Sequence, residues 1–293
     1  MNVFVAGGTG YIGNHVIERL VKDGYKVRSL VRKGSELKLN DKHIEFAYGD
    51  ISDPASLSGA LDGCDAVIYL IGIIREFPVK GITFELAHVE GVKRIYEKAR
   101  LSGVKRWIQI SANGVRPDTR EGYIRTKYRA EEYLKVQDID YTILRPSMVF
   151  GREAEDTMNF VNTVKDLLER FPLIVPVIGN GRYMLQPVHV DDLAQAVSMI
   201  INRQSTFNRT YTLCGAKSVS YNEIIDIVTR MYKLKKKMRM HIPAILIKSL
   251  AKLLQNVESF PVTAEQVEML VYGNTCSDSD LFDELGIRPQ GFY

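Results

Sequence analysis

Cysteine is scarce in this sequence and forms no recognisable pattern. The 293 residues include three cysteines, Cys64, Cys214 and Cys276, which are far apart and odd in number. A disulfide-stabilised secreted domain or a cysteine-based metal site would show an even number or a close, regular spacing. We therefore expect neither a disulfide framework nor a metal site, and a reducing compartment.

Long apolar runs and a strong excess of one charge are also missing. The longest uncharged runs, such as residues 171–181, fall well short of the ~18 residues that a membrane-spanning helix needs. The N-terminus enters an apolar run without a basic leader, and the net charge of +4 suggests no nucleic-acid partner. Hydrophobic residues make up 45% of the chain, enough for a full core. These features predict a globular, cytoplasmic protein without a transmembrane anchor.

A glycine-rich turn stands at the start of the chain. Residues 3–6 are an apolar run of strand length, Gly7, Gly10 and Gly13 follow at a spacing of three, and a helical pattern begins at Asn14. Glycine permits positive φ and lets backbone N–H groups approach a ligand, while a helix N-terminus favours a pyrophosphate. The strand before the turn and the helix after it favour a dinucleotide site over a glycine-rich turn without a ligand.

The second predicted strand, residues 26–31, ends without a carboxylate. NAD(H) sites of this kind place an acidic residue there, whereas arginine accommodates the 2′-phosphate of NADP(H). Arg32 and Lys33 follow the strand, so the sequence favours NADP(H) over NAD(H). The alternative is that both cations belong to a solvated loop. After a third strand, Asp50 stands where a carboxylate can reach the adenine amino group.

Strand and helix patterns alternate up to about residue 150. The expected strands cover residues 26–31, 44–47, 65–71, 106–110 and 141–144, with helices at 54–61, 84–99 and 125–135 between them. This alternation predicts an α/β fold, a doubly wound parallel sheet of the Rossmann type with a small C-terminal cap. Residues 1–150 would form the dinucleotide-binding domain. Residues 151–293 would add the remaining sheet elements and a cap for a substrate or partner, with a blurred boundary.

The second half is less regular. We expect helices at residues 158–170, 190–201 and 221–232, and strands at 173–178 and 211–213.

Tyr123 and Lys127 form a second constellation. Their spacing of four places both side chains on one helical face, where the lysine ammonium can favour the ionised tyrosine and lower its pKa. A tyrosine tuned in this way can exchange a proton while a hydride moves. Ser111, twelve residues earlier, follows a predicted strand and would orient a substrate carbonyl. The alternative is that Ala112, rather than Ser111, occupies this catalytic position.

Several motifs together resemble the short-chain dehydrogenase/reductases, as an atypical member of the extended type. They are residues 7–13, 49–51, 145–151 and 186–192, with Tyr123 and Lys127. Residues 71–73, 83–85, 88–91, 110–114 and 261–267 are similar to a subgroup, that of the nucleotide-binding accessory subunit of respiratory complex I and its bacterial relatives. The resemblance covers nearly the whole chain, and the C-terminal stretch beginning at Pro261 narrows the subgroup.

The resemblance implies a role for each matching residue. Gly7, Gly10 and Gly13 would hold the pyrophosphate, Arg32 the 2′-phosphate and Asp50 the adenine, while Tyr123 and Lys127 would lie by the nicotinamide. The implied cofactor-binding residues are Gly7, Thr9, Gly10, Tyr11, Ile12, Gly13, Arg32, Asp50, Ile51, Ile71, Gly72, Lys127, Pro146 and Ser147. The implied catalytic residues are Tyr123, Lys127 and Ser111.

The sequence departs from the fully active members at one helical position. Their asparagine is His88 here, which weakens the case for a proton relay. We interpret His88 and His189 as hydrogen-bonded packing residues in the first place, Trp107 as core, and Arg145 as a side chain with a structural partner.

Residues 233–254 combine a lysine-rich stretch with apolar positions at helical spacing, including Ile247, Leu250, Leu254 and the following Val257. This pattern fits a helix packed on the cap. It also fits a weak peripheral contact at the inner face of a membrane.

Two functions follow from these observations. The first is an NADPH-dependent reductase or dehydrogenase of an apolar carbonyl or quinone-like compound. The second is a non-catalytic NADPH-binding protein that stabilises or regulates a partner in a membrane-associated respiratory or quinone-related complex.

Overall fold

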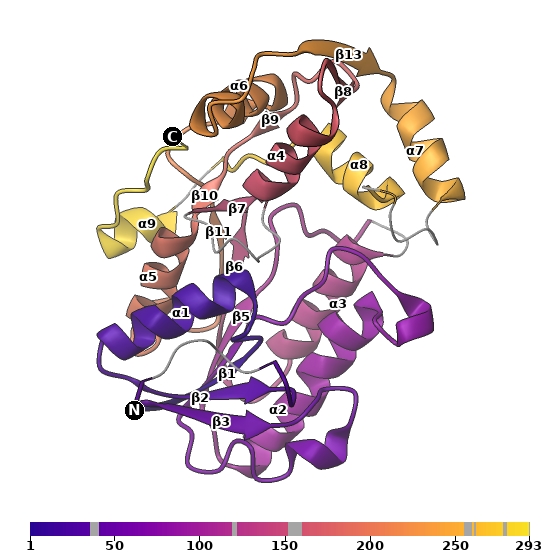
Figure 1. Cartoon of the computed structure of the whole chain (residues 1–293). Helices are drawn as coiled ribbons and strands as arrows, with labels where there is room; N and C mark the ends of the chain where they lie inside the picture. Colours follow the sequence, from indigo (N-terminus) through magenta and orange to yellow (C-terminus); the bar gives the residue numbers. More distant parts are fainter. Residues whose placement is uncertain are drawn as a thin grey trace. The chain divides into compact units, whose positions relative to one another are not determined.

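The computed structural model describes residues 1–35, 41–118, 122–151, 160–254, 260, 262–277 and 280–292. Three residues named above, Met158, Val257 and Pro261, lie outside this part of the chain. The described chain forms two compact units (Figure 1). The first consists of Met1–Pro146, Val190–Leu213 and a later piece that contains α9 (Asp280–Leu285), and the second of most of the remaining residues.

The first unit is built on a parallel sheet. Its strands are β1 (Asn2–Ala6), β2 (Lys26–Val31), β3 (Ile44–Tyr48), β4 (Ala66–Tyr69), β5 (Arg106–Ile110), β6 (Asp140–Pro146) and β11 (Arg209–Leu213). They lie in the order β11-β6-β5-β4-β1-β2-β3, with neighbours parallel throughout. The strand order reverses between β1 and β4, the place where open sheets of this kind bind ligands. The predicted doubly wound parallel sheet is confirmed.

Helices cover both faces of this sheet (Figure 1). Helices α1 (Tyr11–Lys22) and α5 (Val190–Ile200) pack against each other on one side, and α2 (Gly91–Leu101) and α3 (Tyr123–Lys135) lie on the other. Successive strand residues point to opposite faces, so Phe4 joins the core under α2 and α3, where Trp107 is fully buried. The indole N–H of Trp107 donates to Gln109 Oε1 at 3.0 Å, which confirms Trp107 as a core residue.

The helix expected over residues 84–99 is interrupted. A π-helical turn, η3 (Glu85–Glu90), precedes α2, and the helix expected from residue 54 is a short 3₁₀ turn, η1 (Pro54–Leu57). The Tyr69 hydroxyl donates to the carbonyl of Ala87 in the π turn at 2.8 Å. A Cβ at Gly91 would stand 2.2 Å from that hydroxyl, so the buried tyrosine requires glycine where α2 begins.

Helix α9 comes from the C-terminal part of the chain and packs on β11 and α5 of the same unit. Its Glu284 carboxylate accepts hydrogen bonds from Arg203 Nε at 3.1 Å and from the Ser205 hydroxyl at 2.6 Å. The Tyr211 hydroxyl of β11 donates to the same carboxylate at 3.3 Å. Three polar contacts therefore fix this late segment to strands and helices formed much earlier in the chain.

The described residues of the second unit form three two-stranded sheets. They pair β7 (Val149–Phe150) with β10 (Val188–His189), β8 (Ile174–Ile178) with β13 (Met238–Ile242), and β9 (Met184–Leu185) with β12 (Val219–Ser220). Helices α4 (Phe160–Arg170) and α6 (Tyr221–Met231) bury Val164, Leu168, Ile224 and Val228 against Val175 and Val177 of β8. Two further helices, α7 (Ala244–Leu253) and α8 (Ala264–Tyr272), pack against each other. Among the described helices, none has both the length and the apolarity to cross a membrane.

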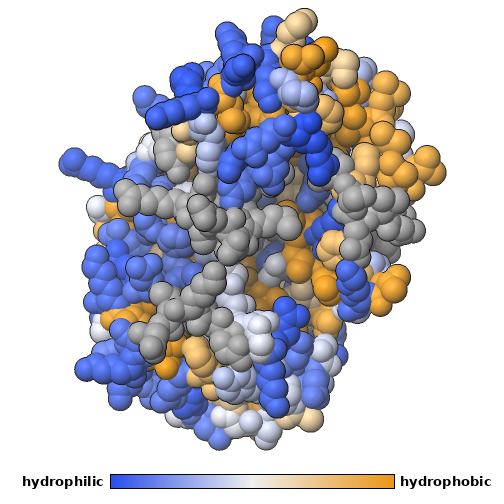
Figure 2. Space-filling model, in the orientation of Figure 1, coloured by the Kyte–Doolittle hydropathy of each residue, from blue (hydrophilic) through white to orange (hydrophobic). Residues whose placement is uncertain are grey.

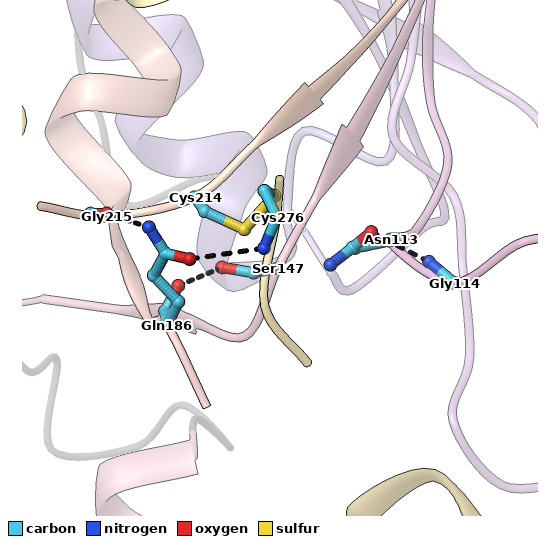
Figure 3. Close-up of a disulfide and its surroundings, with 7 residues drawn as sticks. All are labelled: Asn113, Gly114, Ser147, Gln186, Cys214, Gly215 and Cys276. Carbon is cyan, nitrogen blue, oxygen red and sulfur yellow. Dashed lines mark hydrogen bonds between the residues drawn. A yellow bond between two sulfur atoms is a disulfide. The ribbon is translucent and has the colours of Figure 1, made fainter. Parts of the chain in front are cut away.

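Cys214 and Cys276 form a disulfide in the second unit (Figure 3). The expectation that the cysteines form no disulfide is therefore wrong, and the argument for a reducing compartment loses its support. The two cysteines are 62 positions apart, so only the fold brings their Cα atoms to 5.9 Å. Figure 3 shows Gln186 beside the disulfide, where its side-chain amide donates to Gly215 O at 2.7 Å and accepts from Cys276 N–H at 3.1 Å.

Candidate functional site

The glycine turn between β1 and α1 is held close to the end of β4. Gly7 has a φ of +92°, and a Cβ there would stand 2.8 Å from Ile71 N. A Cβ at Gly13 would stand 2.2 Å from Gly7 O, so only glycine lets α1 begin this close to the turn. Gly10 caps α1 without a side-chain hydrogen bond, and no acidic residue lies in the first helical turn. The N–H groups at this end of α1 therefore suit an anionic ligand.

The other residues predicted to bind the cofactor near the pyrophosphate glycines lie together at this turn. Thr9 and Gly10 are exposed, while Tyr11 and Ile12 are half-buried in the first turn of α1. Ile71 lies against Gly7, and Gly72 follows it. The structure thus brings the loop after β4 to the glycine turn, as expected for one continuous ligand site.

The residues expected at the adenosine end follow β2 and β3. Arg32 is exposed directly after β2, and the described residues 32–35 include no carboxylate. Asp50 follows β3 and accepts the Ser52 N–H through Oδ1 at 2.7 Å. Ile51, next to it, is half-buried, and its carbonyl accepts from Arg94 at 2.6 Å. The roles of Arg32 and Asp50 toward a nucleotide stay predictions.

Tyr123 and Lys127 lie one turn apart at the start of α3. The Lys127 ammonium is buried and donates to the carbonyl of Ile110, the last residue of β5, at 3.2 Å. A Cβ at Gly72 would lie 3.1 Å from Lys127 Nζ. Contacts therefore run from the glycine turn through Ile71 and Gly72 to Lys127.

The pKa values of this pair do not follow the expected tuning. Burial raises the pKa of Tyr123 to about 12, opposite to the predicted lowering by Lys127, so that prediction is wrong. Burial lowers the pKa of Lys127 to about 8, although the nearby Glu131 carboxylate opposes this change. Tyr123 therefore holds its proton at neutral pH, and Lys127 keeps most of its positive charge.

His88 lies in the π turn with both ring nitrogens in hydrogen bonds. Nε2 accepts the Ile73 N–H at 3.3 Å, so Nδ1 carries the proton and donates it to Thr126 Oγ1 at 2.8 Å. The Thr126 hydroxyl in turn donates to Gly122 O at 2.9 Å. Burial and the charge of Lys127 lower the pKa of His88 to about 2. His88 is thus a neutral side chain at physiological pH, and this geometry matches its interpretation as a hydrogen-bonded packing residue.

Two rings, those of Phe84 and His88, pack against the ring of Tyr123. Phe84 and His88 stack with their centroids 5.5 Å apart, and the Tyr123 ring meets them edge-on at 5.9 and 5.3 Å. The half-buried Tyr123 thus stands against an apolar wall made by the π turn and the residue before it.

The Ser111 hydroxyl donates a hydrogen bond to a buried carboxylate. It is buried after β5 and donates to Glu131 Oε1 at 2.5 Å. Arg145 binds the same carboxylate with two nitrogens, Nε at 2.9 Å and Nη2 at 2.5 Å. Ser111 was predicted to orient a substrate carbonyl, but the contact that this geometry provides is the one to Glu131, and a hydroxyl has one proton to donate.

Glu131 also belongs to the candidate site, although the sequence analysis did not predict it. It is fully buried in α3, four residues after Lys127 and eight after Tyr123, on the same face of the helix. That spacing was the available signal. Arg145 was expected to have a structural partner, and Glu131 is that partner.

The remaining predicted residues lie at the end of β6 and in the second unit. Pro146 is buried at the end of β6, and its carbonyl accepts Asn113 N–H at 2.9 Å. Ser147 begins the second unit, and its hydroxyl donates to Gln186 O at 2.5 Å (Figure 3). His189 is buried there, with its ring 5.0 Å from Phe150 and Nδ1 3.1 Å from Gln290 Nε2. In the described part of the chain, no group of three or more His, Cys, Asp or Glu is arranged to hold a metal ion.

Comparison with known proteins agrees with this geometry. Residues 7–167, more than half of the chain, match the family model described as NAD(P)H-binding. The 40 kDa subunit of mitochondrial NADH-ubiquinone oxidoreductase from Neurospora crassa is 28% identical over 97% of this chain and 75% of its own length. Ceramide reductase from Caulobacter vibrioides is 27% identical over 66% of this chain and 58% of its own.

A solved structure shows the same fold. UDP-glucose 4-epimerase from Thermus thermophilus, in complex with NAD, superposes with a TM-score of 0.74 at 18% identity. The match covers 100% of this chain and 95% of that one. Together these similarities confirm the resemblance to short-chain dehydrogenase/reductases and to the complex I accessory subunit.

Proposed function

Because the chain belongs to the family of NAD(P)H-binding proteins, we propose that it binds NADPH in preference to NADH and reduces an apolar carbonyl or quinone-like compound. The observation that carries this proposal is the path of contacts in the first unit. It joins Gly7 to Ile71 and ends with Gly72 beside the buried Lys127, one helical turn from Tyr123. A nucleotide bound at the glycine turn and the proton donor on α3 would then both reach the same bound substrate.

The protonation states favour reduction over oxidation. Bound NADPH supplies a hydride for the substrate carbon, and the substrate oxygen then needs a proton. Tyr123 with a pKa of about 12 carries that proton at neutral pH and serves as the acid. Lys127, still largely charged, is one helical turn from Tyr123 on α3 and would stabilise the negative charge that develops during the transfer. The aromatic wall formed by Phe84 and His88 supports an apolar substrate.

The proton donor is tested by Tyr123→Phe, which keeps the ring and removes the hydroxyl. Loss of a general acid lowers the rate by about 10²- to 10⁴-fold, so NADPH oxidation with an active carbonyl substrate should fall by that order while NADPH binding stays. Tyr128→Phe, the same change on the same helix, is the matched control and should leave the rate unchanged. An unchanged rate in Tyr123→Phe would refute the mechanism.

The choice of cofactor is tested at Arg32. Its guanidinium can bind a 2′-phosphate through charge-assisted hydrogen bonds, so Arg32→Ala should remove most of the preference for NADPH over NADH in a titration. Lys26→Ala removes an exposed cation at the other end of β2 and should leave the preference intact. Equal affinities of the unaltered protein for NADPH and NADH would contradict the assignment.

A second function has its own supporting observation. The Ser111 hydroxyl donates its hydrogen bond to Glu131, and both nitrogens of His88 are in hydrogen bonds, so neither side chain is poised to orient a substrate. A non-catalytic NADPH-binding protein in a membrane-associated respiratory or quinone-related complex would need no such group. NADPH binding without NADPH oxidation across a broad carbonyl and quinone panel would favour this function.

A further inference from the structure

The ribbon of β8 and β13 in the second unit has two different faces. Val175 and Val177 of β8 are fully buried in the core of that unit. The alternate positions pair across the ribbon as Ile174 with Met238 and Pro176 with Met240, and they point to the opposite face. Ile174, Met238 and Met240 are exposed, Met238 by 72%. The outer face of the ribbon is therefore apolar and in contact with solvent.

Helix α7 continues this exposed apolar surface. Ile245, Leu246, Leu250 and Leu253 are all exposed, by up to 80% at Leu253. At 100° per residue these four fall on one side of the helix together with the exposed Ser249, and Lys252 lies at the edge of that side. Ala251 is the residue of α7 that is buried. The helix is amphipathic with its larger apolar side turned outward, the reverse of an ordinary packed helix.

We call this surface the apolar face, made of Met238, Met240, Ile245, Leu246, Leu250 and Leu253. Figure 2 shows hydrophobic side chains gathered over β13 and α7. Monomeric proteins seldom leave a contiguous apolar surface of this kind uncovered unless it meets a partner.

The segment that carries the apolar face is strongly basic. Residues 233–254 include six lysines, one arginine and no carboxylate. This segment carries +7 while the whole chain carries +4, so all other residues together carry −3. Lys233, Lys235, Lys236 and Lys252 are exposed. The other three cations have partners in the fold: Lys237 donates to Leu168 O, Arg239 pairs with Asp226, and Lys248 of α7 pairs with Glu268 of α8 at 2.6 Å.

We infer that the apolar face docks on the surface of a membrane that contains anionic lipids. Apolar side chains between exposed lysines are the arrangement by which interfacial helices bind such surfaces. The apolar face enters the headgroup boundary, and Lys235, Lys236 and Lys252 meet the phosphate groups. A second copy fits less well, because a symmetric contact through the same face would bring the exposed lysines of both copies together. This docking does not depend on whether the protein turns over NADPH.

The test uses the full chain in cosedimentation with vesicles of phosphatidylcholine, with or without phosphatidylglycerol, at low and high salt. We expect binding to the anionic vesicles that weakens as salt is added. Each lysine near an anionic surface changes binding by about fivefold, so Lys235→Gln with Lys236→Gln should weaken it by about 25-fold. Leu246→Ser with Leu253→Ser should weaken it by roughly tenfold or more, since buried apolar area is lost.

Matched controls separate the apolar face from general charge and stickiness. Lys26→Gln with Lys105→Gln removes the same charge from exposed positions of the first unit, and Leu101→Ser with Val136→Ser removes equally exposed apolar side chains. Both controls should bind vesicles as the unaltered chain does, and NADPH affinity should show that every variant is folded.

Three results would overturn the inference. They are no binding of the unaltered chain to anionic vesicles, equal losses in test and control variants, or an oligomer that Leu246→Ser with Leu253→Ser converts to a monomer without any vesicle binding. The last would assign the apolar face to a second copy.

Discussion

Glu131 is the residue on which the polar groups of the candidate site converge. Its fully buried carboxylate receives hydrogen bonds from Ser111 and Arg145, and its charge acts on Lys127. An unpaired buried carboxylate would be strongly destabilising, and these partners compensate it. The same contacts join α3 to the ends of β5 and β6, so they hold Lys127 where it lies.

His88 makes the stability of the fold depend on pH. A histidine with a folded pKa of about 2 and an unfolded value near 6.5 takes up its proton in the unfolded state first. The contribution of neutral His88 to the free energy of unfolding is complete above about pH 6.5. It is lost as the pH falls below that value, by about 1.4 kcal/mol per pH unit. Urea unfolding of His88→Asn should therefore show a shallower loss of stability between neutral and mildly acidic pH. The carboxylates are the same in both proteins, so their effects cancel when the two free energies of unfolding are subtracted. If the free energies of the two proteins change in parallel with pH, the lowered pKa of His88 is contradicted.

Part of the site could be predicted from single residues. The spacing of Tyr123 and Lys127 fixed their common helical face, and α3 does begin at Tyr123. The direction of the Tyr123 pKa could not be predicted, because it depends on burial against Phe84 and His88, residues that are distant in sequence. The partner of the Ser111 hydroxyl was equally hidden, since Glu131 is twenty positions away.

Among the elements, the turn into α1 tolerates the least change. A methyl group at Gly13 would meet Gly7 O at 2.2 Å and Gly8 Cα at 2.7 Å, both backbone atoms that cannot move alone. Gly13→Ala should lower the free energy of unfolding by about 1–3 kcal/mol and weaken NADPH binding by displacing the end of α1. Chemical unfolding and a fluorescence titration would measure both effects. Gly291→Ala, where no atom lies within 4 Å of the new carbon, is the control.

Element types were easier to predict than element boundaries and breaks. The strands at residues 26–31 and 106–110 agree with β2 and β5, because apolar runs between turn residues give clear limits. The π turn at Glu85–Glu90 has no comparable signal, since its apolar residues also fit an ordinary helical period. What distinguishes it is the contact with Tyr69, and that contact exists only once β4 and α2 are assembled.

For the whole molecule, the disulfide makes stability sensitive to redox conditions. A crosslink between residues 62 positions apart contributes about 4 kcal/mol in the chain-entropy model. A thiol reductant should therefore lower the urea midpoint of the unaltered protein. The double variant Cys214→Ser with Cys276→Ser should start lower and show no response to the reductant. If the midpoint of the unaltered protein does not move, the disulfide is absent in solution.

The order of the first six strands follows from rules that can be applied to a sequence. The place of the last strand in the sheet, β11, does not. The alternation of strand and helix patterns predicts β1 through β6. Strand β11 joins β6 after more than sixty intervening residues, most of which belong to the other unit, and no local pattern indicates that return. The pairing of Cys214 with Cys276 was hidden for the same reason.

The attachment of α9 to β11 and α5 has a consequence for synthesis on the ribosome. Glu284 completes the contacts of Arg203, Ser205 and Tyr211, yet it is translated some eighty residues after Arg203. While the second unit is being made, β11 and α5 of the nascent first unit lack this cover. The nucleotide-binding unit therefore begins to fold first and is completed last, so a ribosome that stalls before residue 280 leaves β11 and α5 without this cover and open to chaperones.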